Sequence, residues 1–136
     1  MAELDAVLAE LRSMDDNHDA DQLSDDLARR WSLERGLLAA ANLIFDVANH
    51  IGAGHFSVHP ATYEDGLRLL AARQVIAEET YYGLRGLGGF RNVLAHEYLD
   101  IDLEQVILWK VRILDAVPPL IGQVQAWLDD VQPGEA

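Results

Sequence analysis

The segment from Arg91 to Tyr98, Arg-Asn-Val-Leu-Ala-His-Glu-Tyr, brings together side chains that could act on a phosphate group. Arg91 can hold a phosphate through two parallel hydrogen bonds, and a guanidinium keeps its charge at any ordinary pH. His96 can move a proton near neutral pH, as imidazoles do. Tyr98 adds a hydroxyl group two residues later. This combination of a permanent cation and a proton carrier suits phosphoryl chemistry.

The spacing of these residues sets a geometric condition. Arg91 and Tyr98 are seven residues apart, so they would share one face of a straight helix. Arg91 and His96 are five residues apart, which is roughly 140° around the helix axis. A straight helix would therefore point them in different directions. Two arrangements remain open: the helix ends near His96, or the site is assembled from two protomers across a twofold axis.

The composition predicts a single domain that spans residues 1–136 and buries a real core, because half of the residues are apolar. The absence of cysteine excludes disulfides, thiol catalysis and cysteine-ligated zinc. The acidic start, from Met1 to Asp5, lacks the order of a signal peptide. The longest apolar run, near 37–45, is interrupted by Asn42 and is too short to span a bilayer. We therefore expect a cytoplasmic protein with no membrane segment.

The net charge of −13 limits what the protein can bind. Nucleic-acid-binding proteins normally neutralise phosphates with a basic patch, whereas this chain has 10 basic against 23 acidic side chains. It cannot be a high-affinity, sequence-blind RNA coat. A small site remains possible, in which dimerisation brings two arginines together. Most of the carboxylates are expected to do no more than keep the protein soluble.

Apolar periodicity predicts helices in the first half of the chain. Leu4 to Leu11 form a short amphipathic helix, and residues 13–22 are expected to form a loop. A second helix should run for roughly thirty residues from about Leu23, and the glycines at 52 and 54 should end it. Its core-facing stripe is predicted to contain Leu27, Trp31, Leu38, Ala41, Phe45 and Ala48.

The second half of the chain carries helix start and stop signals. Thr62 followed by Asp65 resembles a capping box, so a helix should begin at Tyr63. A short helix should cover residues 76–87 and end at Gly88-Gly89. Asp102 and Gln105 predict the start of a final long helix, which the two prolines at 118 and 119 should kink.

No segment shows a sustained alternation of apolar and polar residues with a period of two, so no strand is expected. The chain is predicted to be an all-α, antiparallel helical bundle with two long helices and several shorter ones, preceded by an N-terminal helix and loop over residues 1–22.

The Arg-x4-His-x-Tyr pattern resembles the motif of the HEPN superfamily, in the form of the HepT-like toxin family. The resemblance extends to the long helix around Asp46 and His50, the Thr62 cap, the short helix at Ile76 and the segment 89–92. It covers roughly residues 25–125. An Arg-x4-His spacing alone is common in helices, but this helical frame and the tyrosine make the pattern more specific.

The resemblance implies a metal-independent endoribonuclease without a cofactor, acting as the toxin of a toxin–antitoxin pair. Arg91 would hold the scissile phosphate of RNA, and His96 would act as general base or acid. The products would be a 2′,3′-cyclic phosphate and a 5′-hydroxyl. Asn92 would donate to the phosphate or orient the site, and Asp46 could face the cleft in a supporting role. The resemblance also implies a homodimer in which two Arg–His pairs face one another.

Tyr98 matches the tyrosine that nucleotidyltransferase antitoxins of this family modify with AMP. An added phosphate beside the cleft would exclude RNA by charge and by bulk. The resemblance therefore implies a cognate nucleotidyltransferase antitoxin as the second partner, beside the RNA substrate.

Each candidate residue also has a purely structural interpretation. Arg91 could pair with a carboxylate of the bundle, and His96 could cap a helix end. Asn92 could be a local cap, and Tyr98 could be a half-buried anchor. For Asp46, a solvated carboxylate is the simpler account.

A rival site could be built from His50, His55 and His59, since histidine clusters bind zinc or nickel. However, Gly52 and Gly54 make this segment flexible, and the spacing fits no common ligand pattern. We therefore favour a structural role for these histidines and predict no metal site.

Two other functions remain open. A non-catalytic HEPN module could bind nucleotides or support a nucleotidyltransferase, and the negative charge modestly favours it. A purely structural bundle that dimerises is also possible, but it would leave the motif unexplained.

Overall fold

The computed structural model describes residues 1–14, 19–96 and 101–131, and these ranges contain helices and no strand. The predicted all-α bundle with two long helices and several shorter ones is therefore confirmed. The helices are α1 (Ala2–Ser13), α2 (Ala20–Asp25), α3 (Leu27–His55), α4 (Tyr63–Ala72), α5 (Glu78–Leu84), α6 (Leu87–His96) and α7 (Leu103–Val131).

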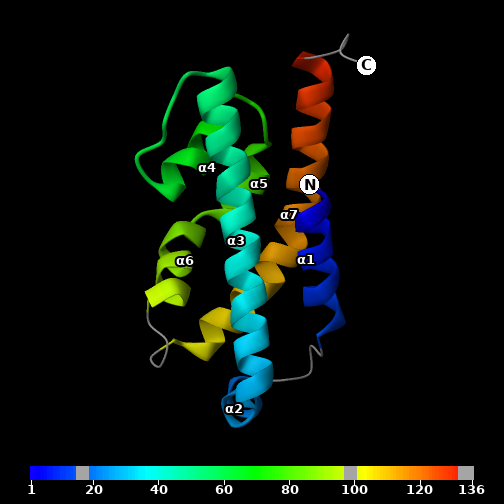
Figure 1. The fold of residues 1–136 in the computed structure, drawn as a ribbon, viewed down its shortest axis with the longest axis vertical. Coiled ribbons are helices and arrows are strands. Elements are labelled where there is room, and N and C mark those ends of the chain that lie inside the picture. The colour runs from blue at the N-terminus through cyan, green and yellow to red at the C-terminus, as the bar shows by residue number, and fades with distance from the viewer. Residues whose placement is uncertain (15–18, 97–100, 132–136) are drawn as a thin grey trace.

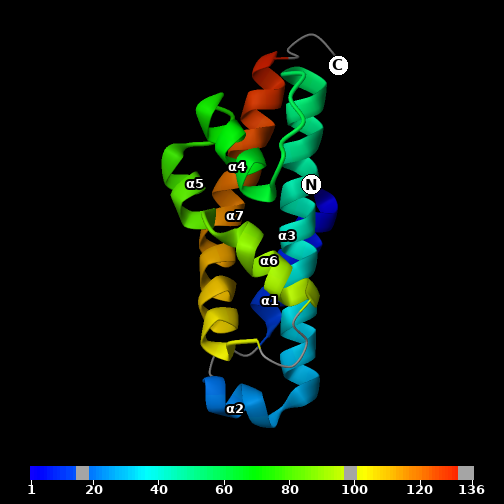
Figure 2. The ribbon, with the colours of Figure 1, turned by 90° about the vertical axis from the view of Figure 1, so that its left-hand side faces the viewer.

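The long helix α3 is the centre of the bundle and contacts α1, α2, α4, α6 and α7. Figures 1 and 2 show that α1 and α6 run antiparallel to α3, whereas α7 runs in the same direction as α3. By length and composition alone, α3 could cross a membrane. Its central position accounts for this composition, because the core helix of a bundle must be apolar on a wide face.

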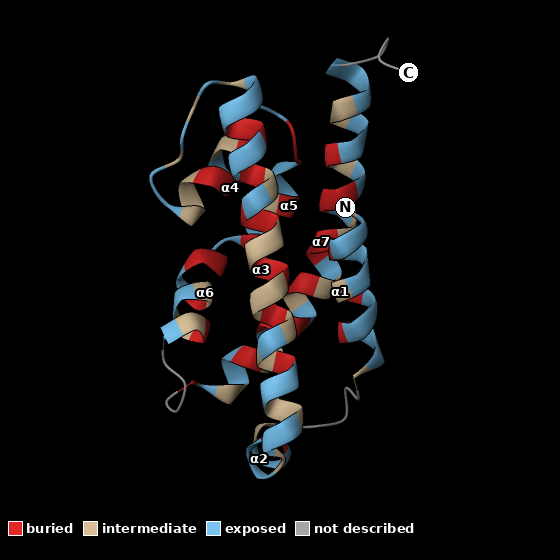
Figure 3. Ribbon diagram, in the orientation of Figure 1, coloured by how far each residue is buried: buried red, intermediate tan, exposed pale blue. Residues whose placement is uncertain are grey.

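The buried face of α3 differs from the predicted stripe at its start. Ala41, Phe45 and Ala48 are buried as predicted, and Figure 3 shows the buried residues gathered where the helices meet. Leu27 and Trp31 are 48% and 58% exposed, so their predicted place in the core was wrong. Both lie off the line of the buried residues Leu33, Leu37 and Ile44, on which the core-facing side of the helix is centred.

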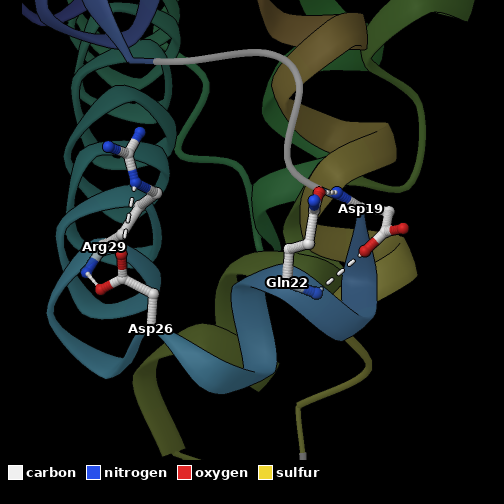
Figure 4. Close-up of polar contacts among 4 residues, drawn as sticks. All are labelled: Asp19, Gln22, Asp26 and Arg29. Atoms are coloured by element: carbon white, nitrogen blue, oxygen red, sulfur yellow. Dashed lines mark hydrogen bonds and ion pairs between the residues drawn. The ribbon is translucent and has the colours of Figure 1, made fainter.

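The expected loop over residues 13–22 was wrong from Ala20 onward, where α2 begins, and the long helix starts at Leu27 rather than near Leu23; residues 15–18 lie outside the described residues. Asp19 begins α2 with a complete capping box: its Oδ1 accepts from the Gln22 amide at 2.9 Å, and the Gln22 side chain accepts from the Asp19 amide at 2.9 Å. Asp26 then begins α3, because its Oδ1 accepts from the Arg29 amide at 3.1 Å. Figure 4 shows both caps. The Asp-rich stretch thus starts two consecutive helices.

The predicted stop at residues 52–54 lies one residue before the observed end of α3 at His55, and Gly52 itself is inside the helix. The carbonyl of Gly52 accepts from the amides of Phe56 at 3.2 Å and Val58 at 2.9 Å. A side chain at position 52 would lie 3.0 Å from the Val58 carbonyl and 3.1 Å from Leu69 of α4. This glycine therefore allows the returning chain and α4 to approach α3 closely.

The predicted cap of α4 is confirmed, because the Asp65 amide donates to Thr62 Oγ1 at 3.1 Å. The single helix expected over residues 76–87 is instead interrupted. Gly86 has a φ of +95°, a conformation that favours glycine, and it separates α5 from α6. Gly88-Gly89, predicted to end a helix, lies inside the first turn of α6.

The final helix α7 forms as predicted. Asp102 Oδ1 accepts from the Glu104 amide at 3.0 Å and serves the first turn. Pro118 and Pro119 lie inside α7 without ending it, and the helix changes direction along its length (Figure 1).

Candidate active site

The helix that carries the motif, α6, is fixed by contacts on both sides. Phe90 and Leu94 point inward and are buried, and the Phe90 ring stacks on Trp109 of α7 with centroids 5.6 Å apart. On the other side, Gly88 lies so close to α4 that a side chain would approach Tyr63 Cβ to 3.1 Å. The position of α6 is therefore set by α3, α4 and α7 together.

The turn that leads into α6 is held by two charged side chains. Glu64 Oε1 accepts from the amides of Gly86 at 3.1 Å and Gly88 at 2.9 Å. These amides include a free donor of the first helical turn, so the carboxylate acts as a remote cap. Arg112 donates to carbonyls at the end of α5: Tyr82 at 3.3 Å, Gly83 at 3.1 Å and Arg85 at 2.9 Å.

Arg91 is half-buried and turned toward α3 and α4. Its Nε donates to Asn42 Oδ1 of α3 at 3.0 Å, and its Nη1 donates to Asn92 Oδ1 at 3.4 Å. Its guanidinium carbon lies 5.0 Å from the centre of the Tyr63 ring, a cation–π distance. The guanidinium is thus positioned by three other side chains.

The partners of Arg91 leave its charge uncompensated. Both hydrogen-bond acceptors are neutral amides, and within 1–14, 19–96 and 101–131 no carboxylate forms an ion pair with Arg91. The alternative in which Arg91 pairs with a bundle carboxylate finds no support in these ranges. A half-buried arginine held in this way is suited to bind an anion such as phosphate.

Two residues that position Arg91, Asn42 and Tyr63, were missed by the sequence analysis. Tyr63 lies between Arg91 and Phe45, with its ring stacked on that of Phe45 at 4.5 Å. Asn42 was read only as a break in an apolar run. A polar amide on the central helix of a bundle needs a hydrogen-bond partner, and this requirement was the available signal.

Asn92 and His96 are both exposed on α6. Being four residues apart, they lie on the same outward face, whereas Arg91 turns inward. His96 is the last residue of α6 that the structure describes, so the choice between the two predicted arrangements stays open.

A pocket of about 610 Å³ opens beside Arg91. Asn92, which contacts Arg91, forms part of its wall. The volume lies within the range of pockets that bind small molecules. The lining comes from α3 (Asn49), the loop before α4 (Pro60, Ala61, Thr62), α4 (Tyr63, Glu64) and α6 (Gly88, Gly89, Asn92).

Of the other two predicted site residues, the structure describes Asp46 but not Tyr98. Asp46 is exposed on α3, four residues after Asn42 and three before Asn49, so the three share one helix face. No hydrogen bond or ion pair joins Asp46 to Arg91 in the part of the chain that the structure describes. Tyr98 lies outside the described residues.

The three histidines of the rival site are not brought together as ligands. His50 and His55 are exposed at the end of α3, and His59 is exposed in the following loop. The His55 ring packs edge-on against Trp127 of α7 at 4.9 Å. Among the described residues, no three His, Asp or Glu side chains are grouped to hold a metal ion.

Comparison with known proteins identifies a family and a relative of this chain. Residues 4–125 match the Ribonuclease HepT-like family, a range that begins in α1 and ends within α7. It starts earlier than the roughly 25–125 suggested by the motif and its frame. The mRNA nuclease HepT of Shewanella oneidensis is 27% identical over 89 residues, which cover 65% of this chain and 67% of that protein.

Proposed function

This chain belongs to the Ribonuclease HepT-like family, and we propose that it is a metal-independent endoribonuclease built on Arg91 and His96. One observation supports this assignment above others. Arg91 is held by neutral amides beside a pocket, on the helix that ends at His96. The protein would act in the cytoplasm as the toxin of a toxin–antitoxin pair.

In the proposed reaction, the RNA 2′-oxygen attacks the adjacent phosphorus and the bond from phosphorus to the 5′-oxygen breaks. Arg91 holds the phosphate and stabilises the negative charge that grows on its oxygens. His96 takes the proton from the 2′-hydroxyl or gives one to the leaving 5′-oxygen. The products are a 2′,3′-cyclic phosphate and a 5′-hydroxyl.

Asn92 is proposed as the helper of Arg91. Its Oδ1 accepts from Arg91, so its amide nitrogen remains free to donate to a phosphate oxygen. Asp46, on the same face of α3 as Asn42, is proposed to support the cleft through hydrogen bonds to groups bound there.

We propose that the complete site forms in a homodimer. Arg91 turns toward α3 and α4 while His96 is exposed at the end of α6, which suits a site that combines Arg91 of one protomer with His96 of its partner. Gly89, on the exposed side of α6, has no atom within 4 Å of the position of a side chain, which leaves room for another helix.

Mixing two inactive variants tests this composite site. A heterodimer of Arg91→Ala and His96→Ala would keep one intact site if Arg91 and His96 come from different protomers. Cleavage by the mixture but by neither variant alone is expected. Mass spectrometry should establish that heterodimers have formed, and an inactive mixture of confirmed heterodimers would contradict the composite site.

The proposed second partner is a nucleotidyltransferase antitoxin that adds AMP to Tyr98. Incubating the chain with ATP and a nucleotidyltransferase encoded beside it should raise its intact mass by one AMP group or more and stop cleavage. Tyr98→Phe should prevent both effects. Modification that persists in Tyr98→Phe would show that the antitoxin modifies another residue.

A non-catalytic nucleotide-binding module is the second candidate, and the net charge of −13 favours it, because strongly acidic proteins repel RNA. Arg91→Ala and His96→Ala separate the possible functions. An enzyme loses cleavage with its fold intact, a nucleotide-binding module loses affinity for nucleotides, and a structural bundle loses neither.

A further inference from the structure

A second pocket, of about 490 Å³, opens on the other side of α6 from the one beside Asn92. Two arginines, Arg85 and Arg112, form part of its wall. Phe90 and Val93 of α6 also line it, which places it next to the residues that carry the proposed chemistry. No part of the proposed reaction uses this pocket.

The two arginines in this pocket have free hydrogen-bonding capacity. Arg112 uses Nε and Nη2 for the carbonyls at the end of α5, and its Nη1 makes no hydrogen bond within the described ranges. Arg85 is exposed, and its guanidinium lies over the Tyr82 ring at 5.4 Å. Neither forms an ion pair with a carboxylate of the described residues.

Two carboxylates near the pair make hydrogen bonds to backbone amides. Asp102, also in the pocket wall, accepts from the Glu104 amide, and Glu64 accepts from backbone amides at the turn into α6. Burial, and then the nearby Arg85 cation, lower the pKa of Arg112 from its usual value, although an arginine stays charged. Two cations that repel each other create a place where an anion is stabilised.

The aromatic residues of the pocket favour phosphate over a base as the occupant. Trp109 has the Arg112 guanidinium over its ring at 3.9 Å and the Phe90 ring stacked against it at 5.6 Å. Trp109 is only 4% exposed, which leaves little room for a stacked base. The cationic groups of the pocket are the two guanidiniums, whose N–H donors bind phosphate oxygens.

We propose that Arg85 and Arg112 form a phosphate subsite that holds the RNA strand beside the Arg91 site. This inference rests on the proposed ribonuclease function. A strand with one phosphate at Arg91 would cross α6, which is about 10 Å wide, and place a phosphate further along the strand in this pocket. In a protein with a net charge of −13, such a local pair of cations supplies attraction that the surface as a whole lacks.

The test measures RNA binding by Arg85→Gln in a His96→Ala background, using a fluorescent single-stranded RNA oligonucleotide over a series of salt concentrations. Arg85 is chosen because it is exposed, whereas Arg112 also holds the end of α5. Affinity should fall about fivefold at low salt. The slope of log affinity against log salt should fall by about 0.7, the value for one lost phosphate contact to a single strand.

Arg73→Gln in the same background is the matched control. Arg73 is also exposed, and its guanidinium also lies over an aromatic ring, that of Phe56 at 5.0 Å. It follows α4 rather than leading into α6, so this variant loses the same charge and the same kind of contact away from the pocket. Its RNA affinity and salt slope should match those of the parent protein.

Three results would overturn the subsite: unchanged RNA binding by Arg85→Gln, an equal loss in Arg73→Gln, or a loss of affinity for AMP without a loss for RNA. Cleavage by the otherwise unaltered protein is measured separately. If Arg85→Gln leaves RNA binding unchanged and the otherwise unaltered protein cleaves RNA, the proposed subsite is contradicted and the ribonuclease function is not. If the protein neither binds nor cleaves RNA, both the proposed subsite and the proposed ribonuclease function are contradicted.

Discussion

Replacing Asn42 by aspartate should separate the position of the Arg91 guanidinium from its charge. Asn42 Oδ1 accepts from Arg91 Nε at 3.0 Å, and an aspartate has nearly the same shape and can accept the same hydrogen bond. The substitution therefore keeps Arg91 in place but adds a negative charge beside it. Asn42→Ala does the opposite, because it removes the hydrogen bond and leaves the charge unchanged.

The expected magnitudes follow from the contact. A hydrogen bond to a charged group contributes about 1.5–3 kcal/mol, and half-burial of Arg91 favours the lower end. Asn42→Ala should therefore slow cleavage about tenfold, mainly in kcat, because the substrate phosphate meets a less well-placed cation. In Asn42→Asp the new ion pair competes with the phosphate. Coulomb's law gives such a pair about 1 kcal/mol in water and about 4 kcal/mol near a protein surface, so kcat/KM should fall between about fivefold and several hundredfold.

Steady-state cleavage of an RNA oligonucleotide and thermal unfolding together test this expectation. Asn42→Asp should lose activity without a fall in Tm, whereas Asn42→Ala should lose activity with a small fall. Gln125→Glu, an exposed site on α7, adds the same charge away from Arg91 and should retain activity. Wild-type cleavage by Asn42→Asp would refute the reasoning that an uncompensated Arg91 charge meets the substrate.

Two further predictions concern the starts of α6 and α4. Gly88→Ala should lower the unfolding free energy by about 1–3 kcal/mol, because its side chain would lie 3.1 Å from Tyr63 Cβ, whereas Gly89→Ala meets no atom within 4 Å and should raise it by about 0.5–1 kcal/mol. Denaturant unfolding measures both, and equal effects would contradict the packing of α6 on α4. Thr62→Ala should cost about 1 kcal/mol by removing the acceptor of the Asp65 amide, and Thr62→Ser should restore most of it in thermal melts. A stable Thr62→Ala would show that the cap contributes little.

Local signals in the sequence were sufficient to predict several parts of the structure. The cap at Thr62 and the start of α7 at Asp102 depend on side chains within three residues of the amides that they serve, so their spacing can be read directly. The overall helical class followed from the period of the apolar residues.

The errors arose where the environment of a residue depends on distant parts of the chain. Gly52 and Gly88 were interpreted as helix ends, but each is the point where another segment approaches a continuing helix. Asn42 and Arg91 are 49 positions apart, and no local pattern joins them. The Asp-rich stretch before α3 was a different case, because the capping box of Asp19 and Gln22 was present in the sequence and was taken for loop composition.

The most direct test of the central claim is cleavage of a defined RNA by the purified protein in excess EDTA, with the product ends identified. The account predicts 2′,3′-cyclic phosphate and 5′-hydroxyl ends from the wild-type protein, and no products from His96→Ala or Arg91→Ala prepared in the same way. Equal cleavage by His96→Ala would contradict the role of the imidazole. No cleavage by a wild-type protein whose intact mass shows Tyr98 to be unmodified would contradict the enzyme itself and favour the nucleotide-binding module.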